Sequence, residues 1–95
     1  MIKIGIIGVG HFGKIHIKCI KNIEHLQLIG FYDINDETAE KVENEFQIKR
    51  FHSMEELVAN VDIVDIVTPT LTHFECASYA IKNYKHVFIE KPITN

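Results

Sequence analysis

The sequence predicts an α/β fold built on a doubly wound parallel sheet. Three observations support this prediction: short apolar runs alternate with helical patterns, no hairpin signal joins two runs, and the first run leads straight into a glycine-rich turn. Because a helix separates each pair of successive strands, we expect parallel strands, right-handed crossovers and helices on both faces of the sheet.

Five strands are expected, each followed by a turn or helix. They are placed at residues 2–7, 26–32, 49–52, 63–67 and 86–89. The almost continuously apolar first run is typical of a strand that is covered on both faces. Such a fold usually has a sixth strand, so we expect the 95 residues to be the N-terminal part of a longer protein, truncated before the last strand.

Helices are expected at about residues 11–22, 36–46, 53–58 and 72–83, and their apolar residues predict which faces are buried. In the first helix the buried set is Phe12, Ile15, Cys19 and Ile23, whereas Lys14, Lys18 and Lys21 are expected on a solvated face. In the second helix it is Ala39, Val42 and Phe46, and in the last helix it is Ala77, Ala80, Ile81 and Tyr84.

Helix starts are marked by capping residues. Asn35 or Asp36 is expected to cap the second helix. The Ser-x-x-Glu pair Ser53 and Glu56, and the Thr-x-x-Glu pair Thr72 and Glu75, are capping boxes that would start the third and fourth helices.

The glycine motif 8–13 lies between the first strand and the first helix, which is the context that gives Gly-x-Gly-x-x-Gly its meaning. Gly8 would allow the tight turn, Gly10 the close approach of a pyrophosphate, and Gly13 the close packing of helix on sheet. The intervening His11 and Phe12 are expected to line the same site. The motif therefore predicts a Rossmann dinucleotide-binding fold, with phosphates at the helix N-terminus.

An acidic residue is required about twenty positions after the motif, and Asp33 stands there at the end of the second strand. Its carboxylate would accept hydrogen bonds from ribose hydroxyls and repel a 2′-phosphate. Ile34, which follows it, is expected to line the cofactor site, and residues 34–36 include no arginine. We therefore expect NAD to be preferred over NADP. The alternative is that Asp33 only caps the next turn.

Composition narrows the class of protein. The net charge is −3 and Arg50 is the only arginine, so a nucleic-acid partner is not expected. No apolar run reaches the length of a membrane span and the start does not resemble a signal peptide, so a cytoplasmic location is expected. Cys19 and Cys76 have no metal-ligand spacing around them and are interpreted as reduced packing residues rather than catalytic thiols; no metal site is expected.

Further polar residues follow the fourth and fifth strands, at the edge where ligands of doubly wound sheets bind. They are Thr68, Pro69, Thr70 and His73 after the fourth strand, and Glu90 and Lys91 after the fifth. A lysine at that position can donate to a carbonyl or hydroxyl oxygen. The alternatives are an exposed helix-start histidine and a solvated loop lysine. Asp65 interrupts the fourth strand, where a satisfied polar contact is expected.

These pieces together resemble the oxidoreductase family of glucose-fructose oxidoreductase and inositol dehydrogenase, the Gfo/Idh/MocA family. The resemblance covers all 95 residues. It rests on the glycine motif with His16 after it, Asp33, the Thr68-Pro69-x-x-x-His73 motif and the Glu90-Lys91-Pro92 motif.

The resemblance implies an NAD(P)-dependent enzyme that oxidises a hydroxyl, or reduces the matching ketone, on a sugar, cyclitol or nucleotide sugar. It implies that Lys91 touches both the nicotinamide and the substrate, and that the remaining catalytic groups lie in a C-terminal domain, which would also form homo-oligomers. Two other interpretations are weighed: a non-catalytic NAD-sensing module, which has no use for Lys91, and a methyltransferase, which has none for Glu90-Lys91-Pro92.

Overall fold

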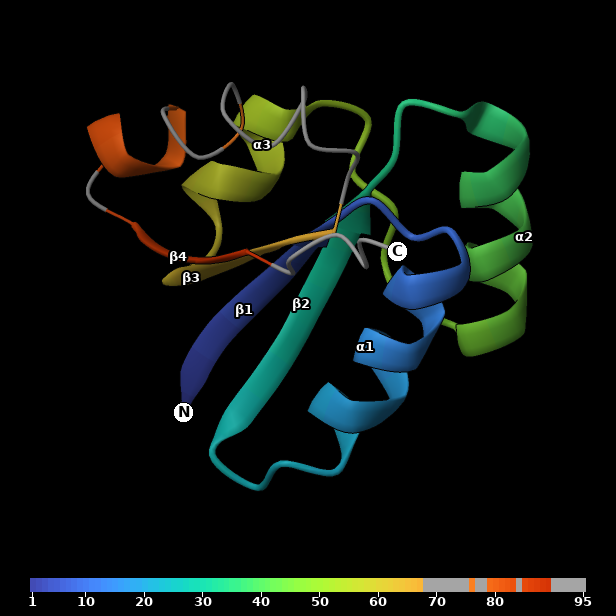
Figure 1. Cartoon of the computed structure of the whole chain (residues 1–95), viewed down its shortest axis with the longest axis horizontal. Helices are drawn as coiled ribbons and strands as arrows, with labels where there is room; N and C mark the ends of the chain where they lie inside the picture. The colour runs from blue at the N-terminus through green and yellow to red at the C-terminus, as the bar shows by residue number, and fades with distance from the viewer. Residues whose placement is uncertain (68–75, 77–78, 84, 90–95) are drawn as a thin grey trace, which may run out of the picture.

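A parallel four-stranded sheet with the order β2-β1-β3-β4 forms the centre of the computed structural model (Figure 1). The structure describes residues 1–67, 76, 79–83 and 85–89, without the side chains of residues 11, 12, 88 and 89. The strands are β1 (Ile2–Ile7), β2 (Leu26–Tyr32), β3 (Ile63–Ile66) and β4 (His86–Ile89), and the helices are α1 (His11–Lys21), α2 (Asp36–Phe46) and α3 (Met54–Ala59). Residues 76 and 79–82 are also helical. The predicted fold class is thus confirmed.

The predicted strand at residues 49–52 is wrong in extent, because this segment forms only an isolated parallel bridge between Phe31 and Arg50. Two hydrogen bonds hold it: Phe31 N–H donates to the Lys49 carbonyl at 3.0 Å, and Phe51 N–H donates to the Phe31 carbonyl at 2.8 Å. The segment is short because Gln47, in the left-handed region with φ 54°, ends α2, and the α3 cap follows at residue 53.

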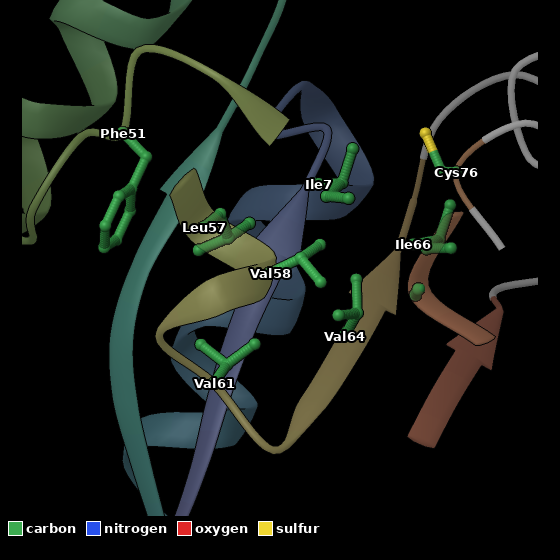
Figure 2. Close-up of a cluster of buried hydrophobic side chains, with 9 residues drawn as sticks. Ile7, Phe51, Leu57, Val58, Val61, Val64, Ile66 and Cys76 are labelled. Carbon is green, nitrogen blue, oxygen red and sulfur yellow. The ribbon is translucent and has the colours of Figure 1, made fainter. Parts of the chain in front are cut away.

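Two apolar clusters hold the sheet, one on each face, and the helices divide accordingly: Figure 1 shows α1 and α2 on one side and α3 on the other. The cluster under α3 is shown in Figure 2 and includes Ile7, Phe51, Leu57, Val58, Val61, Val64, Ile66, Cys76 and Ala80. The cluster under α1 and α2 consists of Ile4, Ile6, Val9, Ile17, Ile20, Phe31, Ala39 and Val42. Burial of these side chains, at about 25 cal/mol per Å² of apolar surface, is the main stabilising term.

The caps of α2 and α3 agree with those predicted from the sequence. The Asn35 side chain accepts a hydrogen bond from Thr38 N–H at 2.9 Å, so Asn35 is the cap of α2. Ser53 Oγ accepts from Glu56 N–H at 3.1 Å, as the first capping box predicts. The second capping box lies outside the described residues.

The buried face predicted for α1 is wrong. Ile15 and Ile23 are 45% and 46% exposed and Cys19 is exposed, whereas Ile17 and Ile20 are buried. The isoleucines of this helix occur on several sides, so the apolar spacing fits more than one helical phase. Sequence periodicity alone could not tell which of the two apolar sides the sheet would cover.

The solvated face predicted for the lysines of α1 is confirmed for Lys18 and Lys21, which are exposed, whereas Lys14 is partly buried. Lys14 Nζ lies 3.4 Å from Glu45 Oε1, and Lys21 Nζ donates to the Phe46 carbonyl at 2.9 Å. Both contacts reach α2, and Lys18 remains exposed. α2 therefore lies along the lysine side of α1.

In the last helix Ala80 is buried as predicted, whereas Ile81 is 63% exposed, so its predicted burial is wrong. Ala77 and Tyr84 lie outside the described residues. Among the helices that the structure describes, none is long and apolar enough to cross a bilayer.

Candidate functional site

The turn out of β1 depends on Gly8, whose φ is 93°. A side chain is strained in that conformation, and glycine is not. Gly8 N–H donates to the Tyr32 carbonyl at 2.9 Å, which fixes the turn to the end of β2. The turn thus directs the chain away from the sheet and into α1.

The other two motif glycines differ in what surrounds them. A Cβ at Gly13 would collide with the carbonyl oxygen of Gly8 and lie 3.4 Å from Cβ of Val9, so the helix can approach the strand only because residue 13 is glycine. Among the residues that the structure describes, apart from its two chain neighbours, none has an atom within 4 Å of a Cβ built at Gly10. Packing of the chain therefore explains Gly13 and does not explain Gly10.

Gly10 is also the N-cap of α1, and Lys14 N–H donates to its carbonyl at 3.0 Å. The first N–H groups of a helix have no partner within the helix, and they carry its partial positive charge. No acidic side chain is present in the first turn of α1 to compensate that charge. The space above Gly10 is thus suited to an anionic group.

Asp33 joins the glycine turn to the end of β2. Its Oδ2 accepts from Val9 N–H and its Oδ1 from Asn35 N–H, both at 2.8 Å. Each carboxylate oxygen can accept more than one hydrogen bond, so capacity remains for a second donor. The structure brings Asp33 beside the glycine motif, and Asp33 does more than cap the following turn.

A shallow hollow lies next to this turn and is lined by Gly10, Lys14, Thr38 and Lys41. It is bounded by the first half of α1 and by α2. Lys14 and Lys41 are themselves paired with Glu45 and Glu37, at 3.4 Å and 3.8 Å.

Sequence reasoning missed the position of Arg50. Its guanidinium contacts the carboxylate of Asp36, three residues after Asp33, and its side chain is only 15% exposed. The bridge to Phe31 brings it there. The absence of arginine from residues 34–36 therefore did not mean that none was near. The signal that could have placed Arg50 is the pairing of its segment with the outer edge of β2. The isolated bridge is too short to be predicted reliably from sequence.

His16 and Asp65 form a second polar contact, between α1 and β3. His16 Nδ1 lies 2.6 Å from Asp65 Oδ2, and Asp65 is 2% exposed. The polar contact expected for Asp65 is confirmed, and the sequence did not identify His16 as its partner. The contact holds α1 against the strand that precedes Thr68.

The structure brings together the predicted residues Gly8, Gly10, Gly13 and Asp33, while Ile34 is 87% exposed. Val67 N–H donates to the Ile7 carbonyl at 2.8 Å, so the end of β3 lies beside the end of β1. The structure does not describe the side chains of His11 and Phe12. The other predicted site residues that lie outside the described residues are Thr68, Pro69, Thr70, His73, Glu90 and Lys91.

The strand order reverses between β1 and β3, and the glycine turn lies at the carboxyl end of β1. This is where open α/β sheets bind their ligands. A parallel sheet, this turn and an acid at the end of β2 define a dinucleotide-binding domain of the Rossmann type. Residues 2–95 match the model of the Gfo/Idh/MocA family, described as an oxidoreductase family with an NAD-binding Rossmann fold. The chain belongs to this family.

Relatives agree with this assignment. The UDP-N-acetylglucosamine 3-dehydrogenase of Acidithiobacillus ferrooxidans is 46% identical over 90 residues, which are 95% of this chain and 28% of that protein. The glucose-6-phosphate 3-dehydrogenase of Bacillus subtilis is 37% identical over 93 residues, 98% of this chain and 27% of that protein. A solved structure of a UDP-N-acetylglucosamine 3-dehydrogenase from A. ferrooxidans has a TM-score of 0.88 at 44% identity, covering 98% of this chain and 30% of that one. The chain thus spans less than a third of the length of these proteins.

Proposed function

We propose that the chain is the cofactor-binding domain of a longer NAD-dependent dehydrogenase. The enzyme would move a hydride between the nicotinamide and a hydroxyl or ketone carbon of a sugar, cyclitol or nucleotide sugar. Family membership supports the reaction class, and the relatives named as 3-dehydrogenases of glucose derivatives support the substrate class. When NAD is bound, its nicotinamide ring is the hydride acceptor.

The observation that carries the proposal is the open space at Gly10. Apart from the two chain neighbours, no atom of the part of the chain that the structure describes lies within 4 Å of a Cβ built there, at the N-terminus of a helix with no acid in its first turn. A glycine that its own chain does not need is explained if a pyrophosphate approaches the backbone at that point. The same helix end would then donate N–H groups to the phosphate oxygens.

The preference for NAD over NADP belongs to the same proposal and rests on two carboxylates. Asp33 would accept from the ribose hydroxyls and repel a 2′-phosphate. Arg50, which could offset that repulsion, is already in contact with Asp36. Equal affinity for NADH and NADPH would contradict the preference.

The catalytic assignment comes from the family resemblance alone. Lys91 would donate to the substrate oxygen beside the nicotinamide. Thr68, Pro69, Thr70, His73 and Glu90 would line the cofactor from the ends of the neighbouring strands. The remaining catalytic groups, the contacts that form a homo-oligomer and the substrate pocket would belong to a C-terminal domain of a protein that acts in the cytoplasm.

A pair of variants of the natural polypeptide tests the proposal. Gly10→Ala should weaken NADH binding at least about tenfold, because a methyl group intrudes on the pyrophosphate, while the melting temperature stays unchanged; tenfold corresponds to about 1.4 kcal/mol. The residue's φ of −68° suits alanine. Gly13→Ala is the control for packing and should lower the melting temperature. Unchanged affinity in Gly10→Ala would refute the phosphate loop. Lys91→Ala, measured alongside, should keep NADH affinity and lose turnover; full turnover would remove the catalytic role.

A further inference from the structure

One side of α1 carries apolar side chains that the described chain covers only in part. We define the apolar flank as Ile15, Cys19 and Ile23, the last lying just beyond the helix end. Ile15 and Ile23 are 45% and 46% exposed, and Cys19 is exposed. Three apolar residues at spacings of four recur on one side of a helix, so they form a stripe rather than scattered contacts.

The orientation of this flank follows from its neighbours. His16 contacts β3, and at about 100° per residue Cys19 lies roughly 60° further round the helix axis. Lys14 and Lys21, which contact α2, lie on the opposite side. The flank is therefore directed away from α2, towards the half of the sheet formed by β3 and β4.

That half of the sheet has apolar residues on the same face. Ile63 and Val67 flank Asp65 with the alternation of a strand, and both are only partly buried at the margin of the cluster under α1 and α2. On the opposite face Val64 and Ile66 are buried beneath the helical residues Cys76 and Ala80. No helix of the described chain covers the α1 side of β3 and β4 as α1 covers β1 and β2.

The handedness of the crossovers limits which part of the polypeptide could cover the α1 side of β3 and β4. The connection from β3 to β4 runs over the α3 face, since Cys76 and Ala80 belong to the cluster on that face. A right-handed crossover from β4 to a further strand at the same edge would also run over the α3 face. The α1 side of β3 and β4 must then be covered by something other than the next crossover of the sheet.

We propose that the apolar flank is the docking surface for a segment of the same polypeptide that lies beyond the nucleotide-binding sheet. The matched relatives are more than three times as long as the chain, which leaves ample polypeptide for this contact. The proposal rests on the proposed function in one respect, because both require a chain longer than 95 residues. It adds which surface of the cofactor domain the remainder contacts.

Cys19 is a native probe of the flank. In the natural polypeptide, its alkylation by N-ethylmaleimide should be at least about tenfold slower than the alkylation at position 18 of a Lys18→Cys, Cys19→Ser variant. Both positions are exposed in the 95 residues, so equal reactivity is expected if nothing covers the flank. Peptide mass mapping distinguishes Cys19 from Cys76, and slow reaction of the buried Cys76 shows that the domain is folded.

Three results would overturn the proposal. They are equal reactivity at the two positions, protection of Cys19 that is lost on dilution and so reveals a second copy as the occupant, and a natural polypeptide that ends at Asn95. NADH titration of the same samples separates this proposal from the proposed function. Bound NADH with reactive Cys19 refutes only the docking surface, whereas protected Cys19 without NADH binding refutes only the nucleotide site.

Discussion

The two halves of the sheet are packed differently. β1 and β2 lie between α1 on one face and α3 on the other, and both helices contact both strands. β3 has buried side chains under helical residues on the α3 face, where Val87 of β4 is partly buried, and the partly buried Ile63 and Val67 lie on the other face. The first half is thus covered by helices on both faces, whereas within the described residues the second half is covered by a helix on the α3 face alone.

This difference corresponds to a division of chemistry. The closed half contains the glycine turn and Asp33, which are already fixed by backbone hydrogen bonds. The one proposed catalytic residue, Lys91, follows β4 and so belongs to the other half of the sheet. On the proposed function, the closed half would hold the cofactor, and the group that meets the substrate would follow the other half.

The largest expected effect comes from breaking a side-chain contact between the two halves, that of His16 with Asp65. His16→Leu removes a partner that lies 2.6 Å from the carboxylate of the buried Asp65. A hydrogen bond to a charged group contributes about 1.5–3 kcal/mol, so the free energy of unfolding in urea should fall by about that amount. The matched control is His25→Leu, an exposed histidine between α1 and β2, which should change it little. Equal effects would show that the halves are not joined through His16.

An intermediate effect is expected in the closed half, on cofactor choice. Asp36→Asn should release Arg50 to meet a 2′-phosphate, and a charged hydrogen bond is worth about 1.5–3 kcal/mol at most. NADPH affinity, measured by fluorescence titration, should rise up to about tenfold while NADH affinity changes little. Glu37→Gln removes the same charge one residue away without touching Arg50, and should not alter the preference. A gain in NADPH affinity in both variants would indicate that net charge, and not the release of Arg50, causes the change.

The smallest expected effect lies at the surface of α2. Lys41 and Glu37 are paired at 3.8 Å with side chains 71% and 83% exposed, four residues apart. Such a pair contributes about 0.2–0.5 kcal/mol, so Lys41→Ala should leave the urea midpoint nearly unchanged. A loss comparable with that of His16→Leu would contradict the contrast between buried and exposed pairs. Weaker NADPH binding in Lys41→Ala would instead implicate the hollow beside Gly10.

Much of the fold could be predicted because local signals and long-range packing agree. β2 and α2 have the predicted bounds, and Ser53 caps α3 through the predicted bond. α1 was assigned the wrong face because Ile15 and Ile17 are equally apolar, and the choice between them depends on where the sheet lies. The strand predicted around Arg50 was too long because strand propensity does not reveal how soon the next helix begins.

The candidate site was predictable to the extent that backbone conformation demands particular residues. Gly8 and Gly13 are required by a positive φ and by a close approach, and Asp33 stands at the distance that a strand-helix-strand unit sets. Contacts between remote segments, such as Arg50 with Asp36 and His16 with Asp65, leave no local pattern and needed the structure.

Asp33 is part of the architecture of the glycine turn, because its two oxygens hold Val9 N–H and Asn35 N–H. Any replacement made to admit another cofactor would also loosen the turn that we propose as the phosphate site. Redesign of cofactor preference in this domain would therefore have to keep the carboxylate and alter the charges around it, with Asp36 and Arg50 as the accessible pair.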